Sequence, residues 1–169
     1  MSKLYERVLV DAPLTQGRGR VVEYLRRQAA GPGDAAVLKL HLSVPIPAPV
    51  NPVTIEKDVL ATFSPESDAG MDPRYGISWK PSAGGPFPIF SGTFTIEGAE
   101  DYDQFWLVLS GTYDPPIGLF GDFFDAIAGR FIARATARNL LEQVRSAVET
   151  AYGIDETAKA GRRAAQTVP

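Results

Sequence analysis

The feature that most constrains the fold is a long helical stretch near the C-terminus, within residues 114–152. Two consecutive prolines, Pro115 and Pro116, end the strand before it and allow a helix to start soon after, because proline has no amide hydrogen and its φ suits a first helical turn. A helix of about 25 to 35 residues spans roughly 40 to 50 Å. Other elements must therefore wrap part of this helix to bury its apolar positions.

Apolar side chains follow two faces of this predicted helix, and the apolar stripe changes from one face to the other near Gly129. The first face carries Phe120, Phe124, Ile127, Phe131 and Ala135. The second face carries Ala133, Ala137, Leu141, Val144 and Val148. Either the first half faces a lumen lined with aromatic rings while the second half packs on a sheet, or the glycine kinks the helix.

Six shorter segments before this helix have the alternating apolar pattern of β-strands, and most are separated by turn residues. They are residues 4–10, 35–44, 53–63, 74–80, 90–97 and 104–113. Because the last five follow one another as hairpins, the pattern predicts an antiparallel meander whose concave face only the long helix can cover. The predicted fold class is therefore α+β, with a curved antiparallel sheet of about six to seven strands around a long C-terminal helix.

A short helix is predicted at residues 21–30, after a loop that contains the sequence QGRGR. This loop could form an anion site at the helix N-terminus. It lacks the spacing of a P-loop or a dinucleotide fingerprint, so the alternative is a flexible turn.

The length of 169 residues favours one domain, assigned to residues 1–152, with a small, polar tail at 153–169 that is poorly ordered or loosely docked. A net charge of -3 argues against nucleic acid as the main partner. The absence of cysteine excludes disulfides and thiolate-bound metals, and we expect neither a metal nor a cofactor. No apolar run is long enough for a signal peptide or a membrane span, so we expect a cytoplasmic protein of unspecified oligomeric state.

The order of these elements resembles the START-like superfamily, also called SRPBCC or helix-grip proteins, which includes polyketide cyclases and lipid-transfer domains. The closest local resemblance is LVLSGTYDPPIGLFGDFFDAIAGRFIARATARNLL at residues 107–141, which looks like the final strand, the proline break and the gripping helix of bacterial members. One difference is that only one helix is visible between the first two strands, where many members have two. These motifs are specific to the fold and not to an activity.

The resemblance implies a cavity between the sheet and the C-terminal helix that holds a hydrophobic or aromatic small molecule. The candidate ligand-binding residues are apolar side chains, almost all aromatic, that are expected to point inward: Phe63, Tyr75, Trp79, Phe90, Phe94, Phe120, Phe124, Ile127 and Phe131. The alternative is that these side chains fill an ordinary core.

No residue is assigned a catalytic role. The only histidine, His41, is expected on the outer face of its strand, and Ser91 and Ser110 have no visible base. A cyclase- or aromatase-like enzyme is the alternative to a binding protein, and its proton-moving groups would come from Lys57, Tyr75, Tyr113 or Arg134. A second alternative is a protein-interaction module.

The arginines at positions 130, 134 and 138 recur at one helical turn. They indicate a solvated face on which Arg138 pairs with Glu142. The alternative is a site for a ligand carboxylate or an acidic partner.

Overall fold

The computed structural model describes residues 1–31, 34–46, 53–67, 73–83, 87–114 and 122–166, and the side chains of residues 46, 53, 67 and 122–127 are not described. Its elements follow one another along the chain as β1 (Ser2–Val10), α1 (Leu14–Arg27), β2 (Ala36–Ile46), β3 (Val53–Ser67), β4 (Arg74–Pro81), β5 (Ile89–Gly98), β6 (Phe105–Asp114) and α2 (Asp122–Gln166). The predicted strands are confirmed, although β3 continues four residues beyond the predicted end.

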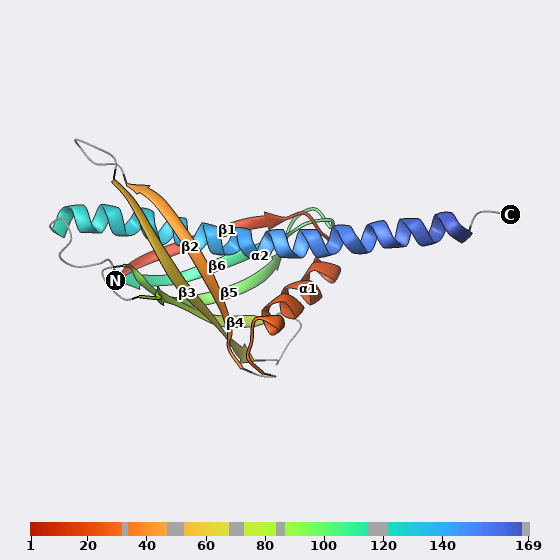
Figure 1. Ribbon diagram of the computed structural model, residues 1–169, viewed down its shortest axis with the longest axis horizontal. Coiled ribbons are helices and arrows are strands. Elements are labelled where there is room, and N and C mark those ends of the chain that lie inside the picture. Colours follow the sequence, from red (N-terminus) through yellow and green to blue (C-terminus); the bar gives the residue numbers. More distant parts are fainter. Residues whose placement is uncertain (32–33, 47–52, 68–72, 84–86, 115–121, 167–169) are drawn as a thin grey trace.

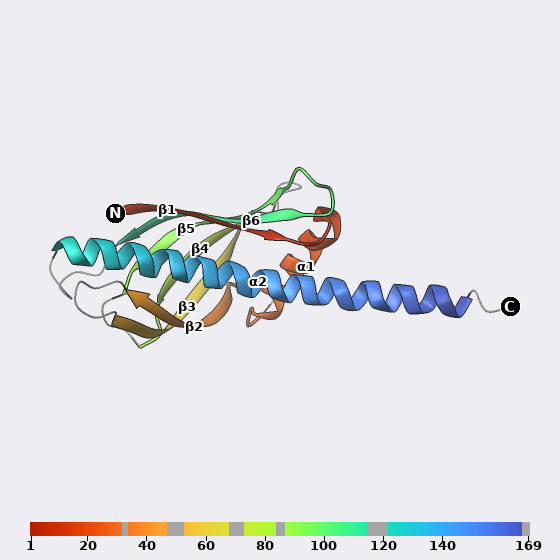
Figure 2. The same cartoon turned by 90° about the horizontal axis from the view of Figure 1, so that it is seen from above.

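The six described strands form one antiparallel sheet in the order β1-β6-β5-β4-β3-β2. Figure 1 shows the sheet curving around α2, and Figure 2 shows that α2 runs along the sheet and continues well beyond α1. The predicted fold class is therefore confirmed.

Strands β5 and β6 approach each other closely at a glycine pair. Gly92 of β5 lies directly opposite Gly111 of β6. A Cβ atom built on either glycine would lie 2.7 Å from Cζ of Phe90, so the ring of Phe90 occupies the space that side chains would take. Glycine is the residue that permits such an approach.

From Ala128 onward one stripe of α2 packs against the sheet. The predicted change of face at Gly129 depends on side chains before residue 128 that are not described, so it stays a prediction. The second predicted face is confirmed, because Ala133, Ala137, Leu141, Val144 and Val148 are all at most 1% exposed. In the earlier part of the described helix Ala128, Gly129 and Ile132 are buried, whereas Phe131 is 45% exposed. The inward orientation expected for Phe131 is therefore wrong, because the stripe recurs every three or four residues from Ala128 and leaves Phe131 outside it.

The helix α2 is 45 residues long, so the predicted length was too short. It does not end near Tyr152 but continues to Gln166. The apolar positions beyond Tyr152 are mostly alanine and glycine, so the sequence has only a weak pattern there, and most of these residues are exposed. Their alanines, lysine and arginines still favour a helix. The weak pattern therefore indicated the lack of a buried face and not the lack of a helix.

The helix α1 begins at Leu14, seven residues before the predicted start, so the expected QGRGR loop is wrong. Gly17 faces the ring of Phe105, and a Cβ atom at this position would lie 2.0 Å from Cε1 of that ring. The glycine is needed for helix α1 to lie close to the sheet and not for a turn. The QGRGR residues are inside the helix, so they do not form the expected loop at its N-terminus.

Candidate ligand-binding cavity

A cavity of about 270 Å³ lies between the second half of α1 and strands β2, β3 and β4. Its lining is mostly apolar, with three polar or charged side chains that can hydrogen-bond. The lining residues are Val22, Leu25, Arg26, Ala29, Gly31, Asp34, Ala36, Phe63, Pro65 and Tyr75. This composition is typical of a site for a small organic molecule.

The position of α1 over the sheet forms this cavity. Val21 and Leu25 are buried in the core, which fixes the helix against the sheet. After the helix ends, the chain reverses direction, and Ala29 bridges Ala36 at the start of β2. The end of α1 therefore covers the corner of the sheet where β2, β3 and β4 meet.

Three aromatic rings form a cluster at the wall of the cavity. Phe63 makes edge contacts with Tyr75, at 6.5 Å between ring centroids, and with Phe94, at 5.3 Å. Tyr75 and Phe94 are tilted at 6.1 Å. Such pairs stabilise a packed cluster by about 0.5–1.5 kcal/mol each beyond the burial of area. Phe63 and Tyr75 line the cavity, while Phe94 supports them from behind.

Trp79 and Phe90 form a second aromatic group that packs within the core. Their rings stack at 4.1 Å, and both side chains are at most 1% exposed. The indole Nε1 of Trp79 donates a hydrogen bond to the carbonyl of Pro88 at 3.0 Å. With its only polar atom satisfied, Trp79 is held in one orientation.

The structure therefore brings together three of the nine predicted ligand-binding residues, Phe63, Tyr75 and Phe94. Phe120 lies outside the described residues. Phe124 and Ile127 belong to the backbone of α2, but their side chains are not described, so a cavity against this part of α2 stays a prediction.

The sequence patterns did not indicate that α1 and the following turn contribute to the cavity. Val22, Ala29 and Asp34 line it although they are distant in sequence from the aromatic strands. Val22 and Ala29 are apolar and lie close in sequence to the buried residues of α1. This apolar pattern is the signal that could have indicated them as lining residues.

The charged side of the cavity is organised by Glu23. Its carboxylate accepts hydrogen bonds from Arg26 and, at 3.0 Å, from Nε of Arg27. The hydrogen bond from Arg27 is the main cause that lowers the pKa of Glu23, partial desolvation opposes it, and Arg26 lowers the pKa further. Arg26 thus lies at the rim already bonded to a carboxylate, as a polar neighbour for a ligand.

His41 lies on the outer face of the sheet, as predicted, with a side chain that is 69% exposed. Its Nδ1 is 2.8 Å from Oδ1 of Asp58 on the neighbouring strand, and the amine of Lys39 is 3.6 Å from Oδ2. The hydrogen bond with His41 is the main cause that lowers the pKa of Asp58, with a further contribution from the charge of Lys39. This group lies on the opposite face of the sheet from the cavity.

The groups considered for proton transfer are dispersed. Tyr75 lines the cavity, and Lys57 lies opposite Leu42 on the inner row of β3. Tyr113 is buried opposite Phe90. The Nε atom of Arg134 donates to Oε1 of Glu6 at 2.6 Å. Ser91 and Ser110 are exposed.

The arginine row is only partly a solvated face. Arg134 is bonded to Glu6 on β1, whose side chain is only 12% exposed, so this arginine attaches α2 to the sheet. Glu142 is 2.9 Å from Arg145. The described ion pairs do not include the predicted pair between Arg138 and Glu142, because Arg145 is the cation bonded to that carboxylate.

Within the described residues, no group of three or more His, Asp and Glu side chains is placed to hold a metal ion. The same part of the chain contains no helix that is long and apolar enough to cross a membrane.

No known family profile and no curated protein sequence matches this chain. Solved structures do match. The Zhui aromatase/cyclase of a Streptomyces species superposes with a TM-score of 0.50 at 15% identity, over 87% of this chain and 93% of that protein. A protein of Thermus thermophilus matches with a TM-score of 0.46 at 14% identity, over 88% of this chain and 98% of its own. At these identities the likeness to the aromatase/cyclase shows the fold.

Proposed function

We propose that this chain, whose architecture is the helix-grip fold of START-like (SRPBCC) proteins, binds a hydrophobic or aromatic small molecule in the cavity beneath α1. The observation that carries the proposal is that Phe63 and Tyr75 form the wall of a 270 Å³ cavity that is otherwise mostly apolar. Ligand pockets for drug-sized molecules usually have volumes of about 300–1,000 Å³. A cavity just below this range fits a molecule of one or two rings.

The polar groups of the cavity support binding more than catalysis. Arg26 is already bonded to Glu23, and the other groups considered for proton transfer are distributed over the sheet and α2. General acid–base catalysis needs such groups within hydrogen-bond reach of one reacting centre. The binding protein is therefore preferred over the cyclase-like enzyme.

The test is a pair of substitutions at neighbouring residues of β2. Ala36 is 4% exposed and lines the cavity, whereas the next residue, Val37, is 44% exposed. Ala36→Leu adds carbon atoms inside the cavity, and Val37→Leu adds one outside it. The probe is the neutral, two-ring fluorescent dye 6-propionyl-2-(dimethylamino)naphthalene, titrated into each folded variant.

We expect Ala36→Leu to weaken dye binding about tenfold, which corresponds to about 1.4 kcal/mol. Val37→Leu should bind the dye as the parent does. Equal affinity of both variants and the parent would place the dye elsewhere and contradict the proposal, as would a parent protein that does not bind the dye.

A further inference from the structure

The last part of α2, residues 153–166, begins beside α1 and then extends beyond the rest of the molecule (Figures 1 and 2). Apart from Glu156 and Lys159, which are half-buried, its residues are exposed, and Ile154 has 65% of its surface in solvent. A Cβ atom added at Gly153 or Gly161 would meet no atom within 4 Å. The segment continues a packed helix, but each of its exposed glycines weakens it by about 1 kcal/mol relative to alanine. A partner that covers one side would stabilise this segment.

The segment carries one continuous apolar face, which we call the terminal face: Ala151, Ile154, Ala158, Gly161 and Ala165. These residues alternate at spacings of three and four, which is the spacing that a second helix packs against. The opposite side carries Glu156, Ala160 and Arg163. The shape of the terminal face therefore fits one more helix.

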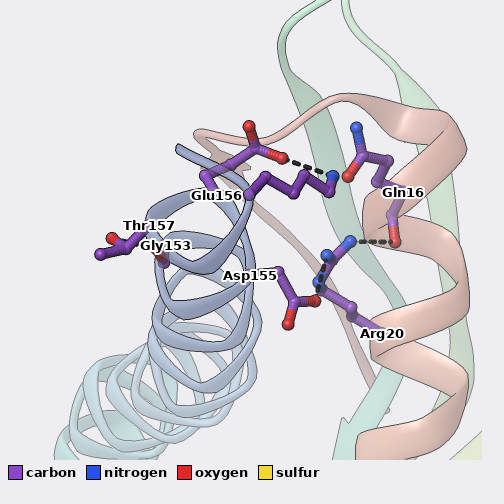
Figure 3. A network of polar contacts seen from close by, with 7 residues as sticks. Gln16, Arg20, Gly153, Asp155, Glu156 and Thr157 are labelled. Carbon is purple, nitrogen blue, oxygen red and sulfur yellow. Dashed lines mark hydrogen bonds and ion pairs between the residues drawn. The ribbon is translucent and has the colours of Figure 1, made fainter. Parts of the chain in front are cut away.

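The terminal face begins in a groove between α1 and α2 with a volume of about 350 Å³. Tyr24 of α1 and Ala147, Ala151 and Ile154 of α2 form its apolar surface, and Arg20, Glu23, Arg27 and Asp155 surround them. Figure 3 shows Arg20 reaching from α1 to Asp155, with a distance of 2.6 Å between Nη2 and Oδ2. The same guanidinium donates to the carbonyl of Gln16 at 3.0 Å and lies over the ring of Tyr152. These contacts fix the direction in which the helix leaves the body.

The charges beside the terminal face are self-complementary. Asp155 and Arg162 lie on the same flank, seven residues apart and on either side of Ala158. When two copies of this helix run antiparallel with their Ala158 residues adjacent, Asp155 of each lies near Arg162 of the other. Arg20 is bonded to Oδ2 of Asp155, so Oδ1 can accept from the second copy.

We propose that the terminal face is a self-association surface, on which the same face of a second copy packs in antiparallel orientation. The end of each α2 then lies in the α1–α2 groove of the other copy. Because most of the contacting residues are small, the interface is small, and association belongs in the weak class of protein contacts. The Asp155–Arg162 pairs make the contact weaker at high salt.

The first test uses two alanines on opposite sides of the same exposed helix. Ala158→Glu places a charge at the centre of the terminal face, and Ala160→Glu places the same charge on the opposite side. Sedimentation equilibrium of the full chain over the micromolar range should show a monomer–dimer equilibrium for the parent. We expect Ala158→Glu to raise the dissociation constant at least tenfold and Ala160→Glu to change it less than twofold. A parent that stays monomeric throughout, or two variants with the same effect, would overturn the proposal.

The second test determines the orientation of the two helices. The chain contains no cysteine, so each introduced cysteine is unique. In an antiparallel pair, the cysteine of Ala158→Cys should form a disulfide with the same cysteine of the second copy under mild oxidation. Ala151→Cys and Ala165→Cys should cross-link efficiently only when the two variants are mixed. Efficient cross-linking of Ala151→Cys with itself would show a parallel arrangement and reject the proposed one.

Discussion

The two halves of α2 form one continuous helix in two different surroundings. Between Ala128 and Val148 a stripe of side chains at most 2% exposed packs on the sheet, whereas from Gly153 onward most side chains are exposed. The backbone conformation is helical in both halves. The comparison indicates that helix propensity is sufficient to continue the helix, while its position on the sheet depends on the buried stripe.

The two halves of α2 should differ most in how much a truncated side chain costs in stability, which one leucine and one isoleucine test. Leu141 is fully buried, and Leu141→Ala should lower the free energy of unfolding by about 2–5 kcal/mol, because it leaves a cavity. Ile154→Ala in the exposed half should change it by less than about 0.5 kcal/mol. Urea unfolding at submicromolar protein, where self-association does not contribute, measures both. Similar costs would show that the second half is packed in solution.

A second pair of substitutions compares a packed position and an open position of α1. Gly17→Ala should destabilise by about 1–3 kcal/mol, because the new methyl group would overlap the ring of Phe105. Gly19, two residues later, has no atom within 4 Å of an added Cβ. Gly19→Ala should therefore stabilise the protein by up to about 1 kcal/mol. Thermal unfolding followed by circular dichroism compares the two, and a stabilising Gly17→Ala would contradict the close packing of α1 on β6.

Removing the ion pair between Arg134 and Glu6, which attaches α2 to β1, should lower the free energy of unfolding by a smaller amount. Arg134→Gln removes the partner of a carboxylate that is only 12% exposed, but the arginine itself is 57% exposed, so the cost should be at most about 1 kcal/mol. Arg138→Gln, one helical turn later at an exposed position, is the control and should cost nothing measurable. Unfolding in urea at low and at high salt should show that the difference shrinks with salt. Equal stability of the two variants at low salt would show that the pair does not attach the helix.

The smallest effect on stability is expected from a substitution of Asp58, which interacts with Lys39 and His41 on the exposed outer surface of the sheet. Its pKa is lowered in the folded protein, so its contribution to stability is fully present above the ordinary carboxyl pKa and is lost as the pH falls through the folded value. Asp58→Asn should therefore lower the melting temperature slightly at pH 5, and the difference from the parent should shrink as the pH falls below the ordinary carboxyl pKa. Asp103→Asn, in the exposed turn before β6, is the control. A difference from the parent that stays constant with falling pH would exclude the linkage to this carboxyl group.

The sequence was sufficient to predict the strands and the packed half of α2, because alternation and helical periodicity record which side chains are buried. The sequence was not sufficient where one residue type occurs in more than one structural environment. Gly17 and Gly19 have the composition of a loop, but Gly17 is needed for contact with Phe105. Phe131 is as hydrophobic as a core residue, yet it lies outside the buried stripe.

The candidate cavity could be predicted only in part. The alternation of β3, β4 and β5 places Phe63, Tyr75 and Phe94 on the inner face, and the structure confirms that these rings meet. The contributions of Val22, Ala29 and Asp34 depend on how α1 lies on the sheet, which no local pattern contains.

The pairing of β1 has a consequence for how the chain is made. Ser2 lies opposite Tyr113 and Val10 opposite Phe105, so among the described strands β1 pairs only with β6, about a hundred residues later. During synthesis, β1 cannot join the sheet until β6 has left the ribosome. Contacts of such long sequence separation slow folding, because the entropy of a large loop is lost before they form. Of the described strands, β1 therefore waits longest for its partner and is exposed longest to chaperones and to wrong partners.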